Sequence, residues 1–425
     1  MKILWLVNIM MPDLSEKLGL NKAVSGGWLS GALGAVRKSE NDIVIVTTVS
    51  SFGEKKCFEI NGVRYYVCER DDRAFMKRCF DEILKSENPD VVHIYGTEFV
   101  QSLVMSKLCE KEKTLVTIQG CMSYIKNEVN AGIPEKISRD NIYHKILRFL
   151  HKGGQSLQLR EFSYEERASY EKTVLENTKY INGGSEWGNA AARSINPDCV
   201  TLDCNLLLRD SFYCDERWES EKCEKHTIYA NCSYSVKGFH MLLEAMPIIL
   251  KRFPDTKIKA VANFSQYRNY GGLRAKIMDK AQDYEWYLQR KIDKYGLRDH
   301  IDYLGYLNEA EVKNQLLKSN VFVSASSIEN QSTSLGEAMI LGVPSVASYV
   351  GAIPEMIDNG VDGFTYPFNE TYILADSIIK IFENDELARQ FSQKGHEHAA
   401  RTYDREKNCR DLIKMYETIY NNERG

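Results

Sequence analysis

The stretch that decides the fold is Ser324-Ala-Ser-Ser-Ile-Glu-Asn-Gln-Ser-Thr-Ser-Leu-Gly-Glu-Ala-Met-Ile-Leu-Gly-Val-Pro344. It follows the apolar run 321–323, which predicts a buried strand, and its closing Gly-Val-Pro is typical of a helix end. Backbone N–H groups of residues 331–334 then lie at a helix N-terminus, where an anion such as phosphate is favoured. Glu329 and Glu337 flank this helix start, with seven residues between them. The arrangement suits a ligand with an anionic centre and hydroxyl groups at both ends, such as a nucleotide sugar.

A purely structural interpretation accounts for the same residues. Ser334-Leu-Gly-Glu337 fits a capping box, in which the glutamate satisfies the first helical turn. Glu329 would then be a solvated loop acid. Spacing alone leaves both interpretations open, because Ser-x-x-Glu before an apolar run is a common pattern.

The same residues resemble the signature of the retaining glycosyltransferases of family four, which have the GT-B fold. The resemblance continues through residues 348–355 and 359–363, so it covers the C-terminal half of the chain. It implies that Glu329 binds hydroxyl groups of the donor sugar and that Glu337 binds the ribose hydroxyls of the nucleotide. It also implies that the donor diphosphate is bound by the main chain of Asn330, Gln331, Ser332, Thr333, Ser334 and Leu335.

Composition predicts a folded protein of the cytosol. The 425 residues suffice for two large α/β domains, and 43% hydrophobic with 27% charged residues is typical of globular chains. A net charge of -4 argues against a general nucleic-acid binder. Eleven cysteines without a C-x-x-C pair favour reduced thiols over a disulfide frame or a zinc site. The apolar start of the chain is short and predicts a buried strand rather than a signal peptide, and no stretch is long enough to span a membrane.

The first half of the chain alternates between predicted strands and helices. Such alternation predicts an open parallel sheet, whose ligands bind beyond the carboxyl ends of the strands. Asn8, Glu98 and Gln119 sit at such ends, and Glu98 is the candidate on the acceptor side. His93 lies within a strand and is interpreted as a core histidine. The strands are predicted at 2–8, 43–47, 89–95 and 115–119, and the helices at 28–38 and 73–86.

A glycine pair and a glutamine complete the candidates in this half. Gly26 and Gly27 permit close backbone approach to a ligand, although a glycine pair is also an ordinary helix entry. In the resembled family this position lies against the donor diphosphate. Many members of that family have a histidine in the place of Gln119. Because glutamine cannot carry a proton, its role here would be a hydrogen bond to the sugar or to the amide groups.

In the second half, Lys237 stands out. It precedes a predicted helix at 239–252, where a cation is unfavourable unless a bound anion lies between the two. Lys237-Gly238 resembles the family's phosphate-binding pair, so Lys237 is the candidate for the donor diphosphate; the alternative is a solvated loop lysine. The family often has an arginine where this chain has Cys232. Stabilisation of the leaving group would therefore rest on Lys237 and backbone amides.

Basic and apolar residues interleave over 135–162 and predict one basic amphipathic helix. We expect residues 136–152 to contact an anionic membrane surface near a lipid-linked acceptor. The alternative is a helix that packs on its own domain and leaves its lysines in solvent.

These features predict a GT-B fold with two Rossmann-like domains whose parallel sheets face across a cleft. We expect an acceptor-side domain at 1–214, a nucleotide-sugar domain at 215–403 that opens on a polar linker at 215–225, and a terminal helix at 404–425 that returns to the first domain. The resemblance implies retaining, metal-independent transfer of a hexose-type sugar from a nucleotide diphosphate, with UDP favoured and no cofactor. The resemblance also implies a glycan or lipid-linked acceptor and a role in surface polysaccharide assembly in the cytoplasm, at the inner face of the membrane. The catalytic candidates are Glu329, Lys237 and Gln119.

Two other functions remain open. A GT-B sugar-nucleotide epimerase has the same architecture and needs no acceptor. A non-catalytic protein that binds nucleotide sugars would fit the departures from the pattern at Gln119 and Cys232. Conversion of a donor without acceptor would identify the first, and nucleotide binding without turnover the second.

Overall fold

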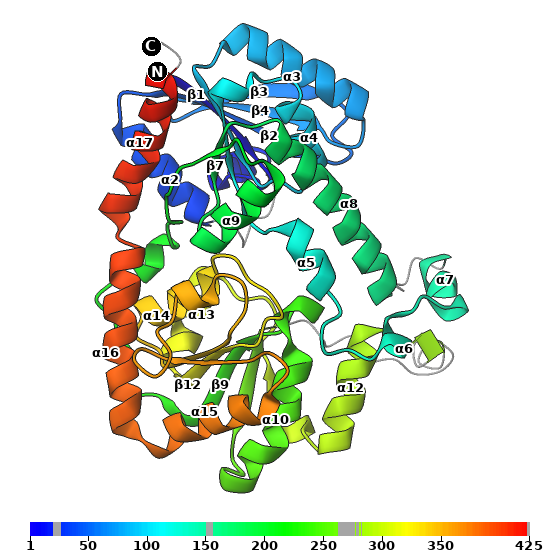
Figure 1. Ribbon diagram of the computed structural model, residues 1–425, viewed down its shortest axis with the longest axis vertical. Helices are drawn as coiled ribbons and strands as arrows, with labels where there is room; N and C mark the ends of the chain where they lie inside the picture. The colour runs from blue at the N-terminus through cyan, green and yellow to red at the C-terminus, as the bar shows by residue number, and fades with distance from the viewer. Residues whose placement is uncertain (20–26, 150–155, 262–276, 278–279, 282, 423–425) are drawn as a thin grey trace. The chain divides into compact units, whose positions relative to one another are not determined.

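The computed structural model describes residues 1–19, 27–149, 156–261, 277, 280–281 and 283–422 (Figure 1). Contacts within the chain divide it into two compact units. The first unit comprises Met1–Ser123, Glu166–Asp210 and Tyr403–Gly425, and the second comprises Tyr124–Glu165 and Ser211–Thr402. No helix among the described residues is both long and apolar enough to cross a bilayer.

The first unit is built on an eight-stranded sheet with the order β3-β4-β2-β1-β5-β6-β7-β8. Every neighbouring pair is parallel except β3 and β4. The central strands β1 and β5 are buried along almost their whole length, as expected for a parallel sheet with helices on both faces. The strands are β1 (Lys2–Val7), β2 (Asp42–Val49), β3 (Lys55–Ile60), β4 (Val63–Glu69), β5 (Val91–Tyr95), β6 (Thr114–Thr117), β7 (Tyr180–Asn182) and β8 (Val200–Thr201).

The helices of this unit follow its strands, and the predicted strand–helix alternation is confirmed. The helix predicted at 73–86 is α3, which begins after Asp72, whose side chain accepts hydrogen bonds from the N–H groups of Ala74 and Phe75. The helices of the first unit are α1 (Pro12–Lys17), α2 (Gly27–Lys38), α3 (Arg73–Glu87), α4 (Val100–Ser106), η1 (Lys111–Lys113), α9 (Glu186–Ile195) and the last helix, α17 (Arg405–Asn422). Helices α5 (Met122–Glu128) and α8 (Leu157–Glu176) each contain a boundary between the units.

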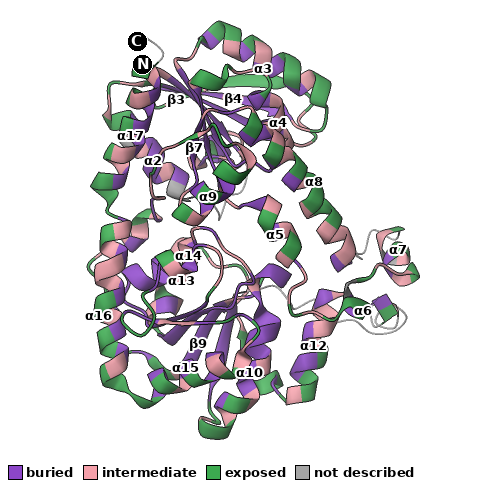
Figure 2. Cartoon of the chain, in the orientation of Figure 1, coloured by how far each residue is buried: buried purple, intermediate pink, exposed green. Residues whose placement is uncertain are grey.

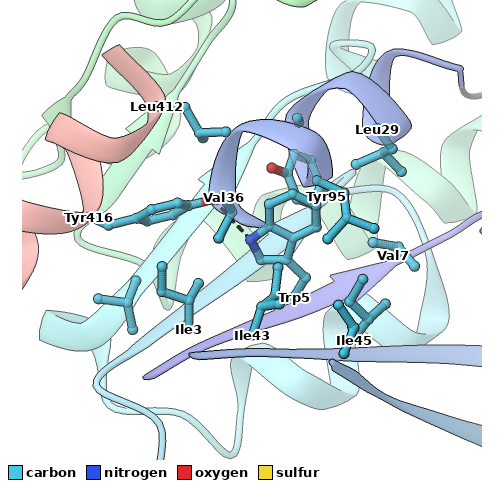
Figure 3. Close-up of a cluster of buried hydrophobic side chains, with 14 of the residues drawn as sticks. Ile3, Trp5, Val7, Leu29, Val36, Ile43, Ile45, Tyr95, Leu412 and Tyr416 are labelled. Carbon is cyan, nitrogen blue, oxygen red and sulfur yellow. Dashed lines mark hydrogen bonds between the residues drawn. The ribbon is translucent and has the colours of Figure 1, made fainter. Parts of the chain in front are cut away.

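A buried cluster ties α17 to the first unit (Figure 3). Trp5 donates from Nε1 to the hydroxyl of Tyr416 at 2.9 Å, and that hydroxyl lies 2.7 Å from Nδ1 of His93. The other ring nitrogen of His93 lies 2.8 Å from Oγ1 of Thr117. Burial lowers the pKa of His93 to about 3, so the ring is neutral. The interpretation of His93 as a core histidine is therefore confirmed.

The second unit is built on a six-stranded parallel sheet with the order β11-β10-β9-β12-β13-β14. Figure 2 shows buried residues in its central strand β9 and in α10, whose buried residues include Phe239, Leu242 and Met246. The strands are β9 (Glu224–Asn231), β10 (Lys257–Val261), β11 (Ile301–Tyr303), β12 (Ser319–Ser324), β13 (Ser345–Ser348) and β14 (Phe364–Tyr366). The helices are α10 (Phe239–Arg252), α12 (Tyr284–Tyr295), α13 (Glu309–Leu317), α14 (Thr333–Ile340), α15 (Thr371–Glu383) and α16 (Asp385–Thr402), with short turns η2 (Asp210–Phe212), η3 (Ser235–Lys237), η5 (Arg298–His300) and η6 (Ile353–Glu355).

The prediction of a single helix over 135–162 is wrong. The structure has α6 (Glu135–Ser138), α7 (Ile142–Phe149) and then α8. Arg139 has an extended backbone, and the side chain of Asn141 accepts hydrogen bonds from the N–H groups of Tyr143 and His144. A side chain that caps a new helix in this way ends the periodicity of the previous one. Residues 150–152 of the proposed membrane segment lie outside the described residues.

The polar segment 215–225 is not a linker. Trp218 is buried and donates from Nε1 to the carbonyl of Ser319 at 2.7 Å. Its N–H donates to the carbonyl of Leu341 at 2.8 Å. The chain enters the second unit at Ser211, and residues 124–165 also group with that unit. The predicted boundaries 1–214, 215–403 and 404–425 stay a prediction.

Candidate functional site

The candidate site of the second unit is built on the segment that follows β12, Ala325 to Glu329. Two neighbouring loops hold this segment through backbone hydrogen bonds. The N–H of Ser327 donates to the carbonyl of Val236 at 2.8 Å, and the N–H of Ala352 donates to the carbonyl of Glu329 at 3.0 Å. The position of Glu329 is thus set by main-chain contacts on both sides.

Two glycines make these contacts possible. Gly238 has a φ of +64°, and a Cβ there would lie 1.7 Å from the carbonyl oxygen of Ala325. Gly351 has a φ of +52°, and a Cβ there would lie 1.9 Å from the carbonyl oxygen of Glu329. Both positions therefore require glycine for its left-handed backbone and for the closeness of the neighbouring chain.

Lys237 and Glu329 form an ion pair at the centre of this site. The same carboxylate oxygen accepts a hydrogen bond from Oγ of Ser326 at 2.7 Å. Burial lowers the pKa of Lys237, but the charges of Glu329 and Tyr234 raise it more, so the pKa stands above its ordinary value. Both side chains remain partly exposed, at 17% for Lys237 and 14% for Glu329. Lys237 therefore stays protonated beside the carboxylate of Glu329, and the chain does not fully cover the pair.

Helix α14 begins beside Glu329 in the sequence and presents an open N-terminus. Its first hydrogen bond runs from the N–H of Gly336 to the carbonyl of Ser332 at 3.0 Å, so the N–H groups of residues 333–335 have no acceptor within the helix. The side chain of Ser332, the residue before the helix, makes no capping bond within the described part of the chain. The capping-box interpretation is wrong, because Ser334 lies inside the helix rather than at its cap. Glu337 projects from the second turn and is 5% exposed.

Cys232 does not replace the missing arginine. It is buried, and its thiol donates to the carbonyl of Ala230 at 3.4 Å. Burial raises its pKa well above the ordinary value, so it stays a neutral thiol. The cation that pairs with Glu329 is Lys237.

The candidates from the first half lie in the first unit, at the carboxyl edge of its sheet. Asn8 and Gln119, which follow β1 and β6, exchange two side-chain amide hydrogen bonds of 2.9 and 3.2 Å. Glu98, which follows β5, is 4% exposed and accepts a hydrogen bond from Arg167 at 3.2 Å. Burial raises the pKa of Glu98 to about 7, although Arg167 lowers it in part. Gly26 lies outside the described residues, and Gly27 is the first residue of α2.

The structure thus brings together Lys237 and Glu329, two of the candidate residues, and adds Ser326, which the sequence reasoning missed. The signal for Ser326 is its position three residues before Glu329, in a serine-rich loop at the end of a buried strand. Glu98 and Gln119 belong to a different unit from Lys237 and Glu329.

A metal ion has one possible location among the described residues. The ligand atoms of Asp358, Asp362 and His398 all lie within 4.8 Å of one another. Asp362 and His398 already share a hydrogen bond of 2.7 Å, and Asp362 also accepts one from the N–H of Asp358. These hydrogen bonds connect a loop to α16 and account for the closeness of the three side chains. Among the described residues, no member of the cluster forms a hydrogen bond with Lys237 or Glu329.

Comparison with known proteins identifies the second unit. Residues 215–398 match the family model described as glycosyl transferases group 1. A phosphatidyl-myo-inositol mannosyltransferase of Mycobacterium leprae is 27% identical over 187 residues, which cover 43% of this chain and 43% of that protein. Residues 215–398 are therefore similar to group 1 glycosyltransferases, and the chain spans less than half the length of this curated relative.

Solved structures identify the fold of the whole chain. A sucrose-phosphate synthase from Thermosynechococcus elongatus has a TM-score of 0.72 at 14% identity, with 99% of both chains covered. The Anabaena protein HepE, in complex with UDP-glucose, has a TM-score of 0.65 at 14% identity, with 98% of this chain and 99% of that chain covered. Because such identities show the fold alone, they establish that the chain has the GT-B fold of these glycosyltransferases, as predicted.

Proposed function

We propose that the protein is a metal-independent, retaining glycosyltransferase that moves a hexose-type sugar from a nucleotide diphosphate, UDP favoured, to a glycan or lipid-linked acceptor. The observation that carries the proposal is the Lys237–Glu329 pair, in a stretch of chain that is similar to group 1 glycosyltransferases and includes the uncapped start of α14. The bound sugar nucleotide named for one structural neighbour, UDP-glucose, supports the choice of donor class.

In this proposal each group has one task. The N–H groups at the start of α14 and the ammonium of Lys237 bind the diphosphate and stabilise the charge that develops as it departs. Glu329, held by its main-chain contacts, accepts hydrogen bonds from the sugar hydroxyls. Ser326, which already donates to Glu329, fixes the orientation of that carboxylate. Holding donor and acceptor in attack geometry supplies a further part of the rate.

The acceptor belongs to the first unit in this proposal. Asn8, Glu98 and Gln119 follow the neighbouring strands β1, β5 and β6, and ligands of open parallel sheets bind at the carboxyl ends of strands. The role proposed for Gln119 is a hydrogen bond from its side-chain amide. The cellular role would be surface polysaccharide assembly in the cytoplasm, at the inner face of the membrane.

The test of the proposed function is a thermal-shift screen of UDP, GDP and ADP and their hexose conjugates, followed by turnover of each stabilising donor. Stabilisation by one nucleotide class and donor consumption only with an acceptor present would support transfer. Donor conversion without acceptor would favour the epimerase. Stabilisation without any turnover would favour a binding protein.

Glu337→Ala should weaken UDP binding about tenfold, because the ribose hydroxyls lose a charged acceptor. The sharper readout compares UDP with 2′,3′-dideoxy-UDP by calorimetry. The wild type should prefer UDP, and the variant should bind both equally. A variant that folds and keeps the preference would remove Glu337 from the ribose site.

Helix α7 is the proposed contact with an anionic membrane surface. Ile142 and Phe149 are 60% and 83% exposed, and exposed Lys145 lies between them on the same helical face. Arg139 and Arg148 pair with the acids Glu135 and Asp140, which leaves Lys145 as the charge of this stripe. An apolar and basic stripe suits the interface of a bilayer that contains anionic lipid.

Phe149→Ser should reduce co-sedimentation with vesicles of phosphatidylcholine and phosphatidylglycerol about threefold or more, because the most exposed aromatic ring leaves the lipid. Tyr372→Ser, at a ring that is 59% exposed on α15, is the matched control and should bind as the wild type does. Equal sedimentation of the wild type with purely zwitterionic vesicles would contradict the proposed contact.

A further inference from the structure

Glu171, on α8, is a buried carboxylate to which the sequence drew no attention. It is 1% exposed and receives three hydrogen bonds. The N–H groups of Met122 and Ser123 donate to it at 3.0 and 2.8 Å, and Oγ1 of Thr97 donates at 2.8 Å. Burial raises the pKa of Glu171, while the donors from Ser123, Thr97 and Met122 act against that rise.

These three donors come from two loops of one sheet edge. Thr97 lies in the loop between β5 and α4, next to Glu98. Met122 and Ser123 open α5, directly after the loop that carries Gln119. Helix α5 has no acidic residue in its own first turn, so Glu171 satisfies its amides from another element.

A second residue of α8, Arg167, also bonds to the β5–α4 loop and adds to the hydrogen bonds of Glu171. Arg167, one turn before Glu171 on the same helix, donates to Glu98 at 3.2 Å and lies over the ring of Phe99 at 5.5 Å. Gln119 is fixed in turn by its paired amide bonds with Asn8. The loops after β1, β5 and β6 are therefore cross-linked, and the buried carboxyl group of Glu171 joins the loops after β5 and β6 through one side chain.

We propose that Glu171 is a positioning residue, which holds the β5–α4 and β6–α5 loops in the arrangement that binds the acceptor. A buried charged group with three donors costs more to disturb than a neutral contact, so the loops are held rigidly. The inference rests on the proposed function in one respect, that the first unit binds the acceptor. We call the three hydrogen bonds from Thr97, Met122 and Ser123 to Glu171 the clamp. All of its residues lie in the first unit.

The test replaces one atom of the clamp. Glu171→Gln keeps the size of the side chain, but it removes the charge and turns one acceptor into a donor. We expect hydrogen exchange of the Met122 and Ser123 amides to speed up about tenfold or more, while amides of β2 exchange as in the wild type. Glu176→Gln makes the same change on the same helix at a carboxylate that is 48% exposed. It should leave hydrogen exchange unchanged both at the Met122 and Ser123 amides and in β2.

A kinetic readout separates positioning from mere stability. With the donor and acceptor found by the screen, Glu171→Gln should raise the acceptor KM or lower kcat about tenfold, while the Kd of UDP stays within about twofold. Thr97→Val should move the same parameters in the same direction, because it removes the hydroxyl from the buried side chain of Thr97. Thr97→Ser retains the hydroxyl, so its acceptor KM and kcat should match those of the wild type.

The outcomes distinguish this inference from the proposed function. Unchanged loop exchange in Glu171→Gln, or equal effects of Thr97→Ser and Thr97→Val, would overturn the clamp even in an active enzyme. Absence of nucleotide binding by the wild type would overturn the proposed function, while faster loop exchange in the variant would still establish the clamp.

Discussion

Replacement of Lys237 by methionine is expected to reduce sugar transfer about 10²–10³-fold, the loss found when one charge-stabilising donor is removed from an active site. Methionine keeps much of the length of the side chain and removes its charge, which lies beside Glu329. Calorimetry should show weaker binding of UDP but unchanged binding of uridine, because Lys237 is assigned to the phosphates alone.

The control for this change is Lys225→Met. Lys225 lies in the same unit, pairs with Asp385 at 2.6 Å and is 42% exposed, so the variant loses a more exposed lysine–carboxylate pair at a residue with no assigned role. Exposed pairs of this kind contribute little to stability, and turnover should match the wild type. If Lys237→Met folds, binds UDP as the wild type does and transfers sugar at the normal rate, the lysine has no part in the site.

The Lys237–Glu329 pair shows how much of this site the sequence predicts. The predictions for Lys237 and Glu329 rest on the family resemblance and on local patterns, a cation before a helix and an acid beside another helix start. Their ion pair joins residues 92 positions apart and could not be inferred from either pattern. It depends on the close approach of Gly238 to Ala325, a property of the packed chain. Local patterns predict candidates, and tertiary contacts decide which of them meet.

Two errors in the prediction of secondary structure have different causes. The hairpin of β3 and β4 was missed although Asn61-Gly62, with positive φ at both residues, is a strong hairpin signal. The helix at 135–162 was predicted too long because its periodicity continues across Asn141, which caps α7. Glu171 had no signal at all, since it lies in a helix rich in charged residues and its burial appears only in the folded chain.

Gly351→Ala is expected to abolish nucleotide-sugar turnover and to lower the thermal midpoint by several degrees. The new Cβ would lie 1.9 Å from the carbonyl oxygen of Glu329 and 3.0 Å from its carbonyl carbon, far inside contact distance. The backbone of Glu329 must therefore move, which breaks its bond from the N–H of Ala352. A left-handed φ adds about 1 kcal/mol of strain for alanine. Differential scanning fluorimetry and donor turnover measure the two effects.

Gly360→Ala separates the strain from the collision. Gly360 lies in the same stretch of chain, has a φ of +78° and has no atom within 4 Å of the position of a Cβ. It should therefore lose about 1 kcal/mol of stability through the backbone alone and keep its turnover. If Gly351→Ala behaves as Gly360→Ala does, the loop that carries Glu329 tolerates displacement. Gly238 and Gly351 would then not be needed to place that carboxylate precisely. A much larger loss at Gly351 means that the site depends on main-chain contact as directly as on its charged side chains.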